Sequence, residues 1–236
     1  MLQYFHACLF SLTKSTLLKA IRNGNLATWP ALTHKNVSKY MDETTATVLG
    51  HLDQCRQGLQ STKPTPPTND NLNPPSIPSS TNQVIAQIIS FQQNNKGYFD
   101  LTGAFPYTST RGNKYVLTLY AYDTNAILVH PLKTKQAHEI KKAWLILHNK
   151  LRSRGMEPSS YVMDNEASNK LKNCLLKNKL PYQLTPPHMH RVNAAERAIR
   201  MFKNHFISGF ATIDPNFPIR EWDCLLPQAE MSQLTA

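Results

Sequence analysis

The stretch TPPHMHRVNAAERAIRMFKNHF, residues 185–206, decides the fold because it leads from a short strand through two prolines into an amphipathic helix. The apolar side chains of the helix recur at helical spacing and form one stripe, made of Ala195, Ile199, Phe202 and Phe206. Glu196, Arg200 and Lys203 lie at i, i+4 and i+7 beside that stripe, at the edge of a core. Taken alone, these charges are also typical of a solvated helix face that carries one Glu–Arg pair.

Positive charge dominates the sequence of 236 residues. Lys and Arg number 26 against 15 Asp and Glu, which gives a formal net charge of +11. Such an excess favours a polyanionic partner, and nucleic acid is the first expectation. The length suffices for one well-packed domain of about 140 residues with smaller attachments.

The sequence carries no signal for secretion or membrane insertion. Its first 18 residues contain neither a basic leader nor a small-residue cleavage site. No stretch approaches the ~18 apolar residues that a membrane span requires. The four cysteines are scattered without the spacing of a disulfide framework. We therefore expect a reducing, intracellular compartment.

Composition divides the chain into three parts. Residues 1–61 read as a small helical unit, residues 62–82 as a linker rich in Pro, Ser, Thr and Asn, and residues 83–236 as an α/β domain. The linker holds six of the sixteen prolines and almost no apolar side chain, so it cannot bury enough surface to order itself.

So small a helical unit often needs a metal to stabilise it. The candidate ligands are His6, Cys8, His51 and Cys55. The sequence contains no Cys-x-x-Cys pair, and His51 and Cys55 form a single loose pair. Zinc is therefore not expected, and these residues are interpreted as ordinary buried or surface side chains.

The third part alternates strands and helices. β-Branched and aromatic residues predict strands over 97–103, 114–122 and 126–131, joined by short turns as in an antiparallel meander. A helix with apolar steps of three and four follows from Ala137 and stops at Gly155. The remaining predicted elements are a strand at 160–163, a helix at 168–179, a strand at 182–184 and the helix of Glu196. This order predicts a mixed five-stranded sheet flanked by helices.

Three acids are placed to form a site. Asp100 closes the first predicted strand and Asp164 closes the fourth, and strand ends are where open α/β sheets bind ligands. Glu196 arrives on the helix at the core edge. Three carboxylates within a few ångströms repel one another and are tolerated mainly when hard cations neutralise them, so Mg²⁺ or Mn²⁺ is expected. Two such ions about 3.5–4 Å apart would promote attack on a phosphodiester.

The sequence around these acids resembles the D,D-E catalytic core of LTR-retrotransposon and retroviral integrases. The matching pieces are Phe99-Asp-Leu-Thr-Gly103, Met163-Asp-Asn-Glu166 and Asn193-Ala-Ala-Glu-Arg197, with 63 and 31 residues between successive acids. The resemblance runs from about residue 98 to residue 228. It implies an RNase H-like fold and two reactions, the processing of DNA 3′ ends and the transfer of those ends into target DNA.

The resemblance also implies roles for individual residues and partners. Asp100, Asp164 and Glu196 would be the catalytic residues and the ligands of two Mg²⁺ or Mn²⁺ ions, and Arg200 and Lys203 would contact DNA. The partners would be element ends and target DNA, bound by a homo-oligomer in the nucleus or in a cytoplasmic particle. The helical unit occupies the place of the zinc-bound module of copia-type polyproteins, where His6 matches a first ligand but the paired cysteines are missing.

Several features depart from the family pattern and leave alternatives open. Ala194 stands where the family often has Gly, and the gap before Glu196 is short. The chain ends soon after Trp222 and Leu226, as a C-terminally truncated fragment of a longer polyprotein would. The alternative to an active integrase is a degenerate or domesticated DNA-binding protein without catalysis, and a third reading is an RNase H-type nuclease.

Overall fold

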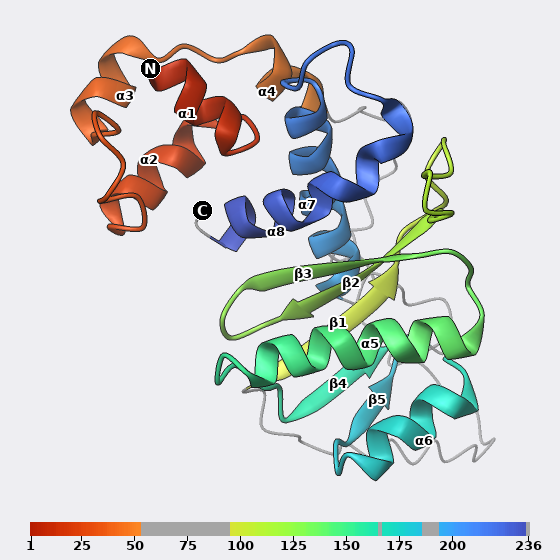
Figure 1. The fold of residues 1–236 in the computed structure, drawn as a ribbon. Helices are drawn as coiled ribbons and strands as arrows, with labels where there is room; N and C mark the ends of the chain where they lie inside the picture. The colour runs from red at the N-terminus through yellow and green to blue at the C-terminus, as the bar shows by residue number, and fades with distance from the viewer. Residues whose placement is uncertain (53–94, 165–166, 186–193, 235–236) are drawn as a thin grey trace, which may run out of the picture. The chain divides into compact units, whose positions relative to one another are not determined.

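A mixed five-stranded sheet organises residues 95–234. The structure is a computed structural model, and it describes residues 1–52, 95–164, 167–185 and 194–234. The sheet has the order β3-β2-β1-β4-β5 (Figure 1). Its strands are β1 (Lys96–Leu101), β2 (Tyr115–Ala121), β3 (Ala126–Leu132), β4 (Ser160–Met163) and β5 (Tyr182–Leu184). The first three strands are antiparallel neighbours, whereas β4 runs parallel to β1 and β5 parallel to β4.

Helices cover both faces of the sheet. They are α5 (Ala137–Arg152), α6 (Asn169–Lys177), α7 (Ala194–Phe210), the 3₁₀ helix η2 (Ile219–Leu225) and α8 (Leu226–Leu234). On one face Phe99 and Leu117 pack with Trp144 of α5 and Leu175 of α6. The opposite face buries a second cluster, made of Val116, Ile127, Val129, Ala198, Phe202 and Trp222. The prediction of a mixed five-stranded sheet flanked by helices is confirmed.

The predicted elements match the structure apart from their ends. The strand predicted over 97–103 ends at Leu101, because the buried Thr102 uses its side chain in the next hydrogen bond to β2. Thr102 N–H still donates to Val116 O at 2.9 Å, but Val116 N–H donates to the Thr102 hydroxyl at 3.0 Å instead of to a backbone carbonyl. The side chain thus replaces the next rung of the ladder. Pro106 lies in the loop beyond the strand.

Residues 1–52 form four short helices, α1 (Leu2–Cys8), α2 (Lys14–Arg22), α3 (His34–Tyr40) and α4 (Thr45–His51). The threonines Thr13, Thr33 and Thr44 cap α2, α3 and α4 by accepting backbone N–H bonds. The helical unit buries a cluster of its own around Leu17 and Val37, a larger core than its length suggested. The predicted linker, residues 62–82, lies outside the described residues.

The short helices are attached to α7 and α8 by close packing and hydrogen bonds. Ser208 of α7 donates to Ala46 O at 2.9 Å, and Gln228 of α8 donates to Cys8 O at 2.8 Å. Gly50 and Gly209 allow the backbones to approach, because a Cβ on Gly50 would lie 2.5 Å from Asn204 O. None of the helices among the described residues has the length and apolar character to cross a membrane.

Candidate active site

Asp100 and Asp164 lie on adjacent parallel strands. In the register of β1 and β4, Tyr98 pairs with Val162. Two residues further along each strand, Asp100 is therefore level with Asp164, which directly follows β4. Neighbouring strands lie about 4.8 Å apart, and residues two apart on a strand share a face. The two carboxylates therefore leave the sheet on one face, at the carboxyl ends of two neighbouring strands.

That face is the one covered by α7. Phe99, Tyr161 and Met163 are buried in the cluster under α5 and α6, so the residues between them face the other way. Asp100 and Asp164 are half-buried there. The Oδ1 atom of Asp100 accepts the Leu101 N–H at 2.7 Å, and the Thr185 hydroxyl, just after β5, lies 3.4 Å from Asp164 Oδ1.

Glu196 enters on the first turn of α7, which packs against β1 and β2. Ala195 and Ala198 on either side of it are buried, and Glu196 itself is exposed at the edge of the contact. The fold thus brings the helix of Glu196 to the face that carries Asp100 and Asp164. The ligand oxygens of all three do not come within 4.8 Å of one another in the described part of the chain.

Arg200 and Lys203 follow on the exposed side of α7. Lys203 also contributes to the wall of a cavity of about 610 Å³. Most of the cavity lining is apolar and comes from the loop after β1, from α7 and from η2. It includes Phe105, Phe206, Ile207, Phe210 and Trp222. Inside this lining Phe105 stacks on Trp222 with ring centroids 4.1 Å apart. Lys203 therefore has a packing environment that Arg200 does not share.

Three of the four zinc candidates of the helical unit lie within the described residues. His6 is buried, and its Nε2 atom lies 2.7 Å from Leu12 O, a contact that holds the turn after α1. His51 is the last residue of α4 and is exposed. Cys55 lies outside the described residues.

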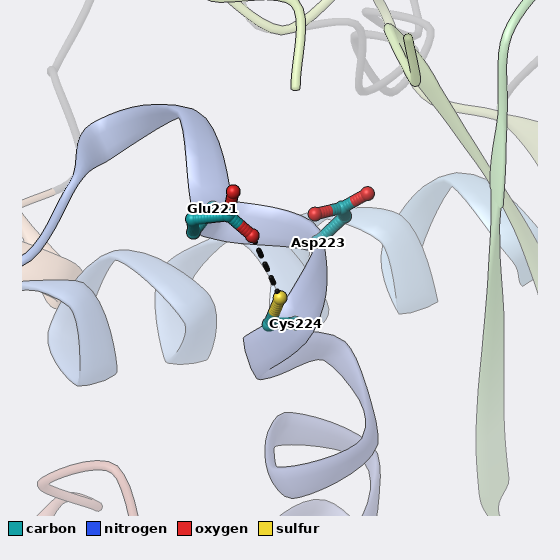
Figure 2. A group of neighbouring side chains, drawn as sticks. All are labelled: Glu221, Asp223 and Cys224. Atoms are coloured by element: carbon teal, nitrogen blue, oxygen red, sulfur yellow. Dashed lines mark hydrogen bonds between the residues drawn. The ribbon is translucent and has the colours of Figure 1, made fainter. Parts of the chain in front are cut away.

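Among the described residues, another group brings its possible ligand atoms within 4.8 Å of one another. It consists of Glu221, Asp223 and Cys224 (Figure 2). Asp223 is buried and accepts hydrogen bonds from three side chains of one loop, Ser109 at 2.9 Å, Arg111 at 2.9 Å and Asn113 at 2.6 Å. Hydrogen bonds from Thr110 and Cys224 hold the pKa of Glu221 below its ordinary value.

These bonds occupy the carboxylate oxygens of the group with donors from the loop between β1 and β2 and with the thiol of Cys224. The group therefore acts as a clamp that joins residues 109–113 to η2. The sequence analysis missed it, because its partners are more than a hundred residues apart and no local pattern marks them.

Comparison with known proteins gives a likeness of fold. No family model matches the sequence, and no curated protein matches it. The HTLV-2 integrase catalytic core domain, solved in complex with magnesium as a dimer, is 18% identical over 58% of this chain and 83% of that one, with a TM-score of 0.44. The catalytic core domain of BIV integrase is 12% identical over 58% of this chain and 82% of that one, with a TM-score of 0.44.

A third structure is the simian T-cell lymphotropic virus intasome in complex with the PP2A regulatory subunit B56 gamma. It is 18% identical over 59% of this chain, with a TM-score of 0.45, and the match covers 48% of that chain. These similar structures are retroviral integrases. At such identities the likeness concerns the fold alone.

Proposed function

We propose that the chain is the catalytic core of a retroelement integrase of the LTR-retrotransposon, copia-like type. It would be a metal-dependent polynucleotidyl transferase that processes DNA 3′ ends and transfers them into target DNA. One observation carries this proposal. Asp100 and Asp164 are level on neighbouring parallel strands, on the sheet face against which the helix of Glu196 packs.

The donor set fits Mg²⁺ or Mn²⁺, because it consists of carboxylate oxygens, two of them half-buried at strand ends. Asp100, Asp164 and Glu196 would hold two such ions. When bound, the ions would activate the attacking oxygen and stabilise the leaving oxygen of a phosphodiester. Glu196 is the exposed member, on the first turn of α7, and its side chain would have to move toward Asp100 and Asp164 to complete the set.

The chain's own cations would bind and orient the DNA. Arg200 and Lys203 lie one and two turns beyond Glu196, where their charges can hold backbone phosphates next to the carboxylates. The net charge of +11 supports the same partner through attraction that does not depend on base sequence. Joining two element ends requires two active sites, so we expect a homo-oligomer, working in the nucleus or in a cytoplasmic particle.

A strand-transfer assay tests the function. Short duplex donors are incubated with the full chain and a supercoiled plasmid in Mg²⁺ or Mn²⁺, and donor joined to plasmid is measured. Asp100→Asn, Asp164→Asn and Glu196→Gln should each abolish joining while thermal unfolding stays near that of the native chain. Asp42→Asn and Glu43→Gln, two exposed acids of the helical unit, are matched controls and should keep full activity.

Joining that persists in Asp164→Asn would contradict the proposed ligand set. Absence of joining and cleavage in the native chain, with DNA binding retained, would instead favour the non-catalytic DNA-binding protein. Cleavage of an RNA–DNA hybrid without any joining of DNA ends would favour the nuclease.

A further inference from the structure

Three tyrosines gather on the sheet face that carries Asp100. Tyr98 of β1 pairs directly with Tyr120 of β2, and their ring centroids lie 6.4 Å apart. Tyr122 follows one step further, where its N–H donates to Lys96 O, and its ring lies 6.1 Å from Tyr98 and 6.2 Å from Tyr120. The three rings therefore form one continuous aromatic surface.

The surface is partly open to solvent. Tyr122 is 51% exposed, and Tyr98 and Tyr120 are half-buried. Tyr120 packs against the core under α7, and its hydroxyl donates to Asn125 at 2.9 Å, which fixes the ring. Burial, with the neighbouring Tyr122 and Tyr120, raises the pKa of Tyr98. The cluster is thus a patch that begins at the packed core and extends beyond it.

Positive charge adjoins the tyrosines. Burial raises the pKa of Tyr120, and the positive charge of Arg197 on α7 acts in the opposite direction. Lys96 shares the face with Tyr98 and Asp100, because these three alternate along β1. A surface of aromatic rings with cations beside it complements bases and phosphates.

The patch lies directly upstream of the proposed active site. Tyr98 and Asp100 are two residues apart on one strand and on one face, which separates their Cα atoms by about 7 Å. A strand whose phosphate reaches Asp100 and Asp164 would therefore bring its neighbouring nucleotides over the tyrosines. Bases inside a duplex are already stacked on each other, so only unpaired bases can use the rings.

We propose that Tyr98, Tyr120 and Tyr122 form a stacking surface for unpaired bases of the DNA strand that enters the site. The proposal rests on the proposed function and makes its substrate more specific, a DNA end with a short single-stranded tail.

The test measures binding of the full chain to two fluorescent DNAs by anisotropy, in EDTA so that no chemistry intervenes. One is a blunt duplex, and the other is the same duplex with a short single-stranded tail. Tyr98→Leu and Tyr122→Leu should weaken binding to tailed DNA by about 5-fold or more and leave blunt DNA unchanged. Tyr98→Phe and Tyr122→Phe should bind as the native chain does, because the aromatic face is kept.

Tyr40→Leu is the matched control, since Tyr40 is 64% exposed on α3 outside this surface. Thermal unfolding is followed for all variants, and Tyr122→Leu carries the test if Tyr98→Leu fails to fold. Equal affinities of the Leu and Phe variants for tailed DNA, or equal weakening on blunt and tailed DNA, would overturn the proposal and leave the face as a protein contact.

The two proposals can fail separately. Strand transfer by the native chain together with indistinguishable Leu and Phe variants would overturn the stacking surface alone. No strand transfer, together with a clear difference between Leu and Phe on tailed DNA, would overturn the integrase function and leave a protein that binds single-stranded ends.

Discussion

A buried histidine in α7 predicts a strong dependence of stability on pH. His205 is 3% exposed, its Nε2 atom lies 2.7 Å from the Ser232 hydroxyl, and its ring faces Phe10 with centroids 5.5 Å apart. Its Nδ1 atom is buried without a hydrogen-bond partner among the described residues. Burial, with a smaller contribution from the charge of His51, lowers the pKa of His205 to about 4.

The sign and size of the effect follow from this shift. The ordinary pKa is 6.5, so between pH 6.5 and about 4 the unfolded chain binds a proton that the folded chain does not. The free energy of unfolding therefore falls as the pH falls through this window. Lowering the pKa from 6.5 to about 4 corresponds to about 3 kcal/mol of unfolding free energy lost by pH 4. Burial of His130 and His148 lowers their pKa values too, and they add in the same direction.

Urea unfolding followed by tryptophan fluorescence at several pH values between 7 and 4.5 measures this loss. His205→Gln removes the titrating ring, so its unfolding free energy should fall less steeply with pH than that of the native chain. His138→Gln is the control, because His138 is exposed and its replacement should leave the native pH dependence. A slope in His205→Gln equal to the native slope would refute the assignment of the loss to His205.

Three further predictions concern DNA contact and packing. Arg200→Ala and Lys203→Ala should each reduce the slope of log K for DNA binding against log salt concentration by about one unit, whatever the DNA sequence. Binding titrations at several salt concentrations measure this slope, and unchanged slopes would mean that the two side chains form only a solvated face. Asp223→Ala leaves three donors of residues 109–113 unsatisfied and should cost about 1–3 kcal/mol in urea unfolding, whereas an unchanged midpoint would contradict the clamp. Gly209→Ala would place a Cβ 1.7 Å from the Phe10 ring and should lower the free energy of unfolding by about 1–3 kcal/mol. A urea midpoint at or above the native value would contradict close packing of α7 on the turn after α1.

The sequence predicted the elements whose patterns are long or sharply bounded. The strands at 160–163 and 182–184 have the predicted ends, and the helix begun at Ala137 ends at Arg152, three residues before Gly155. Within the helical unit the bounds of single helices were not predicted, and α1, α3 and α4 are only seven residues long. The antiparallel pairing of the first three strands was predicted, since short turns favour antiparallel neighbours, whereas the position of β4 beside β1 was not predicted.

What escaped the sequence analysis depends on contacts between distant residues. The clamp around Asp223 joins positions more than a hundred residues apart, and nothing in either local sequence predicts the partner. The tyrosine surface was within reach, since Tyr98 and Asp100 alternate in one predicted strand. Tyr120 could not be added to this surface without the register of β1 against β2, which sets it opposite Tyr98.

The position of the carboxylates is decided by residues that take no part in the proposed chemistry. Burial of Phe99, Tyr161 and Met163 under α5 and α6 turns Asp100 and Asp164 to the face of α7, because side chains alternate along a strand. A slip of one residue between β1 and β4 would carry Asp164 to the buried face, where an unpaired charge is expensive, and would expose Tyr161. The burial that stabilises the sheet therefore also excludes the registers that would place the two acids on opposite faces.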